Sequence, residues 1–128
     1  MTKILFICTG NSFRSPVAEA LTKKYKPELE VHSAGTHPAE IIAQNGKNLL
    51  NKEGALEKIK EHPEPVTREK IDESDKIIVM KDEHAKIIGD NFQIDSGKIE
   101  IWDIDDPINP DVRAEDSFRQ IKQKVKQL

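Results

Sequence analysis

The chain has 128 residues, of which 36% are hydrophobic and 34% are charged, and its formal net charge is -3. This length suits one domain spanning residues 1–128, which buries about two-thirds of the surface that the unfolded chain exposes. The charges alternate in sign and nearly balance, so we expect neither nucleic acid nor an anionic membrane as a partner.

Cys8 is the only cysteine, which excludes an intramolecular disulfide. The apolar run that contains it is cut off by Gly10, Asn11 and Arg14, and is too short for a signal peptide or a membrane span. We therefore expect a cytoplasmic protein, because the reducing cytosol keeps a free thiol unpaired. The sequence has no CxxC, HExxH or His-rich spacing, so no metal site is expected.

Strand and helix patterns alternate along the chain. In chain order, the periodicities predict strands at 3–8, 29–34, 76–80 and 98–102, and helices from 15 and over 39–53, 68–74, 82–88 and 114–128. Gly54 and Gly89 are expected to end two of the helices, and 61–67 is expected to be an extended loop. Alternation of this kind implies parallel strands joined by right-handed crossovers, and hence a three-layer α/β fold. Such folds bind ligands beyond the carboxyl ends of their strands.

The segment CTGNSFRS, residues 8–15, joins the first strand to the first helix. A helix N-terminus offers unpaired N–H groups and a dipole that favours an anion, and Gly10 lets the loop curl so that further N–H groups turn inward. Arg14 can grip two oxygens of a phosphate. Cys8, facing this positive potential, is expected to act as a nucleophile, with the Ser15 hydroxyl donating to its sulfur.

The alternative is that Cys8 merely ends a core strand and that Arg14 and Ser15 are solvent-exposed residues at a helix start. A lone free cysteine is usually buried and inert. The combination of Cys, five intervening residues and Arg-Ser-Pro at a strand-to-helix junction favours the nucleophile.

CTGNSFRSP resembles the C-x5-R-S/T phosphate loop of the low-molecular-weight protein tyrosine phosphatases, and VHSAGT, KIIVMKDEH and DDP follow in that family's order. The resemblance covers most of the chain and implies a four-stranded parallel sheet flanked by helices on both faces. It also implies hydrolysis through a cysteinyl-phosphate intermediate, without a metal or a cofactor. The residues implied in phosphate binding and loop support, with Asn11 and Ser33 stabilising the loop from below, are Thr9, Gly10, Asn11, Ser12, Phe13, Ser15 and Ser33.

The leaving alkoxide or phenoxide needs a proton, and WDIDDP places Asp103, Asp105 and Asp106 after the last strand. The family's general acid is the Asp directly before Pro, which is Asp106 here. Clustered carboxylates are expected to raise one another's pKa, and the sequence leaves open whether Asp105 shares the role. The alternative is an acidic turn in which Asp caps the backbone around Pro107.

Three departures from the family pattern bear on function. Phe13 stands where relatives often have a second cysteine, so we expect no protective disulfide with Cys8 and an apolar wall beside the substrate. Ile108 and Asn109 stand where tyrosine phosphatases typically have aromatic residues, which leaves phosphotyrosine preference open. The segment KDEHAKIIGD lacks the cysteines with which thioredoxin-coupled arsenate reductases of the same fold relay oxidation.

The sequence therefore predicts a phosphomonoesterase acting on aryl phosphates, in a phosphorylated small molecule or a phosphoprotein, with protein phosphotyrosine as one candidate. The alternative is an arsenate reductase that uses an external thiol such as glutathione or a redox protein. A third hypothesis is a non-catalytic phosphate-binding module. We expect a monomer, with His62 on a surface loop and His84 packing on or capping its helix.

Overall fold

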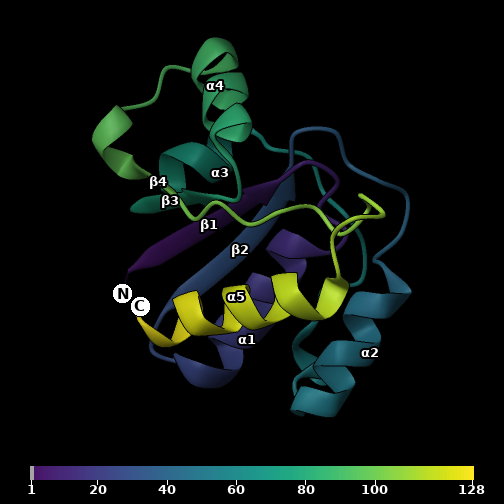
Figure 1. The fold of residues 1–128 in the computed structure, drawn as a ribbon. Coiled ribbons are helices and arrows are strands. Elements are labelled where there is room, and N and C mark those ends of the chain that lie inside the picture. The colour runs from purple at the N-terminus through teal and green to yellow at the C-terminus, as the bar shows by residue number, and fades with distance from the viewer. Residues whose placement is uncertain (1) are drawn as a thin grey trace.

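The computed structural model describes residues 2–128, which form a four-stranded parallel sheet between two layers of helices (Figure 1). The strand order is β2-β1-β3-β4. The strands are β1 (Lys3–Cys8), β2 (Glu30–Gly35), β3 (Lys76–Val79) and β4 (Ile99–Ile101). The α-helices are α1 (Arg14–Tyr25), α2 (Gln44–Glu53), α3 (Arg68–Glu73), α4 (Asp82–Asn91) and α5 (Ala114–Lys126), with 3-10 turns η1 (Leu56–Lys58) and η2 (Ser96–Lys98). Across these described residues, no helix is both long and apolar enough to cross a bilayer.

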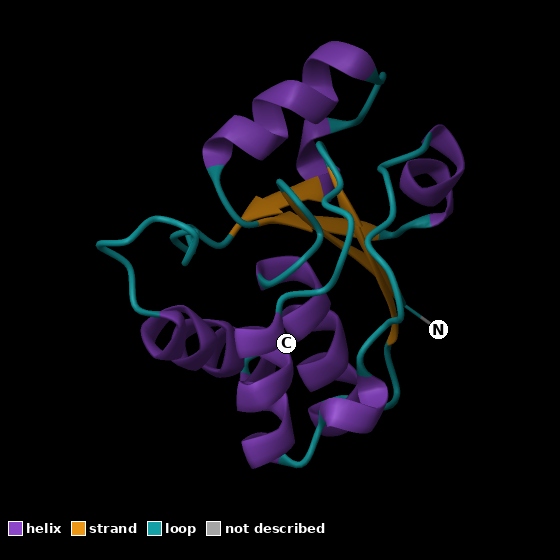
Figure 2. Cartoon of the chain, turned by 90° about the vertical axis from the view of Figure 1, so that its right-hand side faces the viewer, coloured by secondary structure: helices purple, strands orange, loops and turns teal. Residues whose placement is uncertain are grey.

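The central strand β1 contributes side chains to both halves of the core. Phe6 and its alternate neighbours pack under α1, α2 and α5, whereas Leu5 and Ile7 pack under α3 and α4. Figure 2 shows helices on both faces of the sheet. Successive side chains of a strand point to opposite faces, so the continuous apolar run of β1 follows from burial on both sides. The predicted three-layer α/β fold is confirmed.

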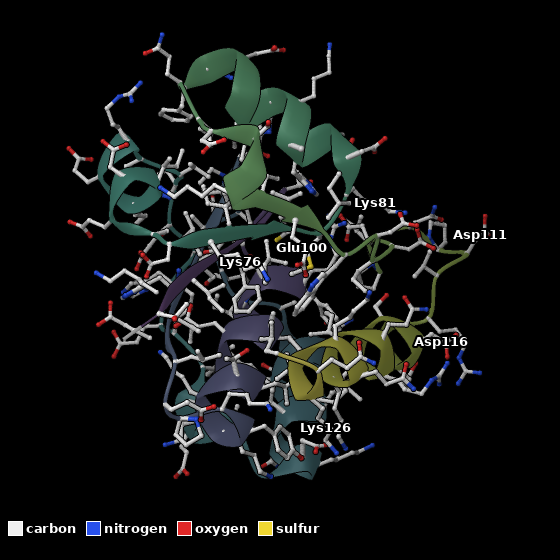
Figure 3. The ribbon with its side chains drawn as sticks, turned by 90° about the vertical axis from the view of Figure 1, so that its left-hand side faces the viewer. Lys76, Lys81, Glu100, Asp111, Asp116 and Lys126 are labelled. Atoms are coloured by element: carbon white, nitrogen blue, oxygen red, sulfur yellow. The ribbon has the colours of Figure 1, made fainter. Side chains whose placement is uncertain are left out.

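The last helix is amphipathic, as its spacing predicts. Phe118, Ile121 and Val125 are buried in the larger core cluster, and Leu128 is partly buried against it. The edge strand β4 is short and partly exposed. An ion pair of 2.9 Å between Lys76 and Glu100 spans β3 and β4 there (Figure 3).

Two helix boundaries differ from the sequence expectation by more than two residues. The helix expected from residue 39 begins only at Gln44, because the N–H of Ala43, which would close the first turn, donates to the Ser12 carbonyl of the loop that follows β1 instead of to a helical carbonyl. The helix expected to stop at Gly89 continues to Asn91. A glycine inside a helix costs only about 1 kcal/mol, and the buried Ile88 holds this last turn, accepting the N–H of Phe92 at 2.9 Å. Gly54 ends α2 in the left-handed region, with φ of 74°, as expected.

The strand register brings the informative loops together. β1 pairs with β2 from Lys3 opposite Glu30 to Cys8 opposite Gly35, and β1 also pairs in parallel with β3. The carboxyl ends of all the strands therefore meet at one edge of the sheet. The loops that follow β1, β2 and β4 lie at this edge, where open α/β folds bind their ligands.

Candidate active site

The loop of residues 9–13 joins β1 to α1 and lies against the segment 36–43. Carbonyl oxygens of Cys8, Thr9 and Gly10 accept N–H groups of this segment at 3.0, 2.8 and 2.9 Å, and that of Ser12 does so at 3.0 Å. The C=O and N–H of a planar trans peptide point in opposite directions. The N–H groups of residues 9, 10, 11 and 13 therefore point away from segment 36–43, toward the inside of the loop. Such a ring of donors at a helix N-terminus is an anion-binding arrangement.

The Cys8 thiol lies at the base of this loop. Its Sγ is 3.0 Å from Oγ of Ser15, and Nδ2 of Asn11 donates to the same Oγ at 2.8 Å. A hydroxyl has one proton and two lone pairs. Because Asn11 fills one lone pair of Ser15, the Ser15 proton is left for the sulfur at 3.0 Å or for the Ala34 carbonyl oxygen at 3.5 Å, and the sulfur is the nearer of the two. This geometry suits stabilisation of a thiolate at Cys8.

Asn11 is supported from below by charged side chains that the sequence analysis did not identify. Asn11 has a positive φ of 51°, a conformation that Asn tolerates better than most residues. Its Oδ1 accepts from Nζ of Lys60 at 2.8 Å and from the backbone N–H of Glu64 at 2.9 Å. Its Nδ2 donates to Oγ of Ser33 at 3.0 Å, and Ser33 in turn donates to buried Glu19 at 2.5 Å.

Lys60 is the least expected member of this support. Its side chain is only 9% exposed, and burial lowers its pKa from the usual range, against the opposing effect of nearby Glu19 and Glu64. Besides Asn11, it donates to the backbone oxygen of Ser33 at 2.9 Å. A lysine in a run such as EKIKEH gives no sequence signal for this role, since burial arises only when distant segments meet.

Arg14 opens α1 and is almost fully buried, with 3% of its side chain exposed. Its Nη1 donates to the backbone oxygen of Ile104 at 2.9 Å, which fixes the guanidinium plane. Its Nη2 lies 3.2 Å from Oδ2 of Asp106 and 3.4 Å from Oγ1 of Thr9. Arg14 thus links the loop of residues 9–13 to the loop that follows β4.

The three aspartates of that second loop have different partners. Lys81 forms ion pairs with Asp103 at 2.7 Å and with Asp105 at 2.6 Å, and Figure 3 shows Lys81 beside the loop. The bond to Lys81 lowers the pKa of Asp105. The expectation that the clustered carboxylates raise one another's pKa is wrong for Asp105, because an ammonium group lies closer than its neighbours do. Asp106 instead bonds Arg14 at the cleft.

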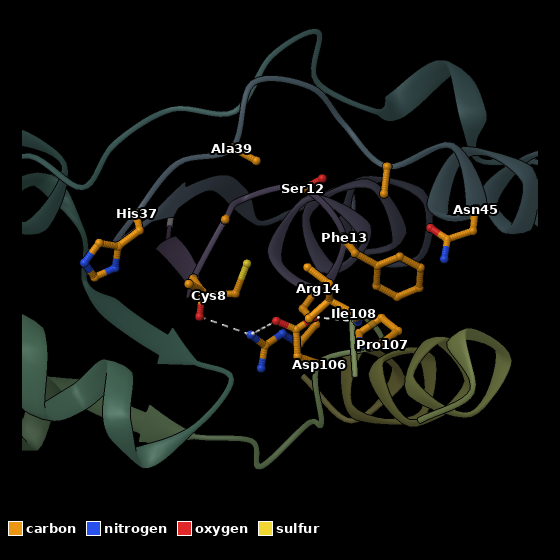
Figure 4. A pocket seen from close by; sticks show the side chains of 13 residues that line it. Cys8, Ser12, Phe13, Arg14, His37, Ala39, Asn45, Asp106, Pro107 and Ile108 are labelled. Atoms are coloured by element: carbon orange, nitrogen blue, oxygen red, sulfur yellow. Dashed lines mark hydrogen bonds and ion pairs between the residues drawn. The ribbon is translucent and has the colours of Figure 1, made fainter. Parts of the chain in front are cut away.

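A cleft of about 400 Å³ opens above the loop of residues 9–13, and Figure 4 shows Arg14 and Asp106 within it near Cys8. Asn11, Ser15 and Ser33 lie buried beneath it. Ile108, at 86% exposure, forms part of its wall, and Phe13 contributes an apolar surface. The lining residues are Cys8, Thr9, Gly10, Ser12, Phe13, Arg14, His37, Ala39, Ala43, Asn45, Asp106, Pro107 and Ile108.

His62 and His84 lie in different surroundings. The His62 side chain is 76% exposed on its loop, as expected. His84 is fully buried, and its Nδ1 accepts the backbone N–H of Lys81 at 3.1 Å, which caps α4 as expected. The sequence did not indicate its second contact, in which Nε2 lies 2.8 Å from Oγ1 of Thr9.

Comparison with known proteins agrees with this geometry. Residues 3–128 match the family model described as low molecular weight phosphotyrosine protein phosphatase. A low molecular weight protein-tyrosine-phosphatase of Staphylococcus haemolyticus is 34% identical over 92% of this chain and 88% of its own. A protein-arginine-phosphatase of Bacillus subtilis is 35% identical over 70% of this chain and 62% of its own. The solved structure of an arsenate reductase of Archaeoglobus fulgidus has a TM-score of 0.76 and 25% identity, covering 97% of this chain and 96% of that one.

The family match extends over nearly the whole chain and includes both loops of the cleft. It confirms the resemblance drawn from CTGNSFRSP, and with it the predicted enzyme class. The chain belongs to the low molecular weight phosphotyrosine protein phosphatase family.

Proposed function

We propose that this protein hydrolyses phosphate monoesters, or the phosphoramidate of phosphoarginine, in protein side chains or small molecules through a cysteinyl-phosphate at Cys8. The observation that carries the proposal is the meeting of three groups at one cleft: the Cys8 thiol, the buried Arg14 guanidinium and the Asp106 carboxyl. Nucleophile and acid come from loops nearly a hundred residues apart in sequence. The inward N–H groups of the loop of residues 9–13 supply the oxyanion site between them.

In the first step, the Cys8 thiolate attacks phosphorus, the bond from phosphorus to the leaving oxygen of a phosphate ester, or to the leaving nitrogen of phosphoarginine, breaks, and Asp106 gives that atom its proton. In the second step, the Asp106 carboxylate takes a proton from water, which attacks phosphorus. The sulfur–phosphorus bond then breaks, and phosphate and thiolate are released. Arg14 and the loop N–H groups stabilise the equatorial oxygens in both steps. The Ser15 proton stabilises the thiolate as it departs.

Asp106 is assigned the acid role because Asp105 is held elsewhere. Asp105 is paired with Lys81 at 2.6 Å and its pKa is lowered, so it stays ionised and cannot supply a proton near neutral pH. Asp106 reaches the cleft and bonds Arg14. A phosphate dianion that engages Arg14 takes over this bond and frees the Asp106 carboxyl for the leaving group.

The substrate class follows from the relatives and from the cleft wall. The relatives named above include enzymes named for tyrosine and for arginine as their phosphorylated residues. Pro107 and Ile108 give this cleft an aliphatic wall beside Asp106. Such a wall can pack against an aromatic ring or against an alkyl chain, and it offers no aromatic side chain that would favour the ring by stacking. Both phosphotyrosine and phosphoarginine in proteins are therefore proposed substrates. A free thiol nucleophile works in reducing surroundings, which makes the cytoplasm the proposed location.

A second candidate function is arsenate reduction, favoured by the similarity to the arsenate reductase structure. Arsenate has the tetrahedral shape and charge of phosphate and fits the same anion site. Cys8 is the only cysteine, so reduction requires two thiols of an external donor such as glutathione: arsenate and two thiols give arsenite, a disulfide and water.

One preparation tests both functions. Aryl-phosphate hydrolysis, release of phosphate from phosphotyrosine and phosphoarginine peptides, and arsenite formation with glutathione are measured for the wild type. We expect Cys8→Ser to abolish hydrolysis and Asp106→Asn to lower kcat by about a hundredfold or more. Asp105→Asn is the matched control, with a loss below about threefold, because Asp103 still pairs with Lys81. Equal losses in the two aspartate variants contradict the assignment, and arsenate turnover exceeding hydrolysis favours the second function.

A further inference from the structure

His84 connects the N-terminus of α4 to the cleft, although it is fully buried and does not line the cleft itself. Its Nδ1 accepts the backbone N–H of Lys81 and therefore carries no proton. A neutral imidazole has a single N–H, so Nε2 is the protonated nitrogen and donates to Oγ1 of Thr9 at 2.8 Å. The neutral form is the stable one here, because burial, together with the Arg14 charge, lowers the pKa of His84 to about 4.

The Thr9 hydroxyl is left with one direction for its own proton. The N–H of His84 fills one of its lone pairs, and Nη2 of Arg14 approaches the other at 3.4 Å. A hydroxyl with both lone pairs occupied by donors acts as a donor itself. Thr9 lines the cleft in which Cys8 and Asp106 meet. Its free O–H therefore turns toward the space in which the phosphoryl oxygens lie.

We propose that His84 is a positioning residue that aims the Thr9 hydroxyl proton at the phosphoryl group held in the cleft. This inference rests on the function proposed above. Thr9 adds a side-chain donor to the backbone N–H groups of its own loop. Because His84 is uncharged, it orients the hydroxyl without adding a cation beside Arg14. The bond between His84 and Thr9 also fixes the side of the loop of residues 9–13 that faces α4. Thr9 is held through its hydroxyl by His84 and through its carbonyl by segment 36–43.

The competing explanation is that His84 only caps α4. Two variants separate the two contacts of the imidazole. In His84→Asn the side-chain oxygen lies where Nδ1 lies and can still accept the Lys81 N–H, but the side chain is too short to reach Thr9. In His84→Gln the terminal amide nitrogen lies near the position of Nε2 and can still donate to Thr9. Thr9→Val removes the hydroxyl at constant shape, and Thr9→Ser retains it.

The experiment measures kcat and KM for an aryl phosphate, with melting temperatures recorded for every variant. We expect Thr9→Val and His84→Asn each to lower kcat/KM by about tenfold, the loss of one hydrogen bond to a charged group. The double variant is expected to fall no further, because both changes remove the same oriented donor. His84→Gln and Thr9→Ser are expected to recover to within about threefold of the wild type. Losses that multiply in the double variant, or a wild-type rate in His84→Asn, overturn the proposal.

Calorimetric titration with inorganic phosphate separates this inference from the proposed function. We expect the Kd for phosphate to rise about tenfold in both Thr9→Val and His84→Asn, with His84→Gln close to the wild type. Absence of turnover in the wild type contradicts the hydrolase function, yet weaker phosphate binding in both variants still supports the role of His84. Equal phosphate binding in all variants, with unchanged kcat/KM, refutes it.

Discussion

The buried ammonium group of Lys60 offers the sharpest test of how the nucleophile loop is held. Lys60→Met keeps the unbranched stem but removes the bonds to Oδ1 of Asn11 at 2.8 Å and to the carbonyl of Ser33 at 2.9 Å. Hydrogen bonds from charged groups contribute about 1.5–3 kcal/mol each. Part of this is offset, because the lowered pKa of Lys60 shows that burial disfavours its charge. Asn11 also keeps the backbone N–H of Glu64. We expect a net loss of about 2 kcal/mol in the free energy of unfolding.

The same substitution should affect catalysis through Asn11. Asn11 fixes Ser15 and holds a left-handed conformation, so loosening its amide misplaces the donor to Cys8. We expect kcat/KM for an aryl phosphate to fall about tenfold, since small misplacements at a reacting centre cost one to two orders of magnitude. Urea denaturation and steady-state kinetics measure the two effects. Lys58→Met is the matched control, because Lys58 is exposed nearby. If both variants differ from the wild type by less than about 0.5 kcal/mol and retain full activity, Lys60 does not support the loop.

Three further predictions concern neighbouring elements. A Cβ at Gly35 would lie 2.6 Å from the Thr9 carbonyl oxygen, so Gly35→Ala should displace the loop and lower kcat/KM by about a hundredfold, whereas Gly89→Ala, with open space around it, should keep full activity. Lys81→Met removes the ion pairs of Lys81 with Asp103 and Asp105. We expect kcat to fall about fivefold and the unfolding free energy to change by less than about 1 kcal/mol. An unchanged kcat contradicts a role of Lys81 in holding the loop that carries Asp106. The pKa of His84 is lowered from 6.5 to about 4, so the unfolded state binds the proton first as the pH falls: full stability holds above pH 6.5 and is lost toward pH 4. Between pH 7 and pH 5 this amounts to about 2 kcal/mol, and a variant such as His84→Asn should lose that part of the pH dependence in denaturation experiments.

Local patterns in the sequence determined the elements and the nucleophile loop. The apolar run of Lys3–Cys8 and the stripe of Phe118, Ile121 and Val125 are set by which face of a strand or helix is buried, and burial periodicity is visible in one dimension. Cys8, Arg14 and Ser15 also lie within one segment of eight residues. Their proximity therefore needed only the strand-to-helix junction that the sequence predicts.

Tertiary structure alone decided how that loop is supported and which carboxylate faces it. Lys60 and His84 contact the loop of residues 9–13 from segments about 50 and 75 residues away in sequence. Both residues lie in sequence patterns typical of exposed segments, so the sequence does not indicate these contacts. Asp105 and Asp106 are adjacent in sequence and chemically identical. They differ because Lys81, just before α4, pairs with Asp105, whereas Arg14, at the start of α1, pairs with Asp106. The start of α2 was also decided by tertiary structure, because the carbonyl of Ser12 accepts the Ala43 N–H that an earlier helix start would need. The loop support, the difference between the two aspartates and the start of α2 all depend on contacts between residues far apart in sequence. A local sequence pattern carries no information on the energies of such contacts.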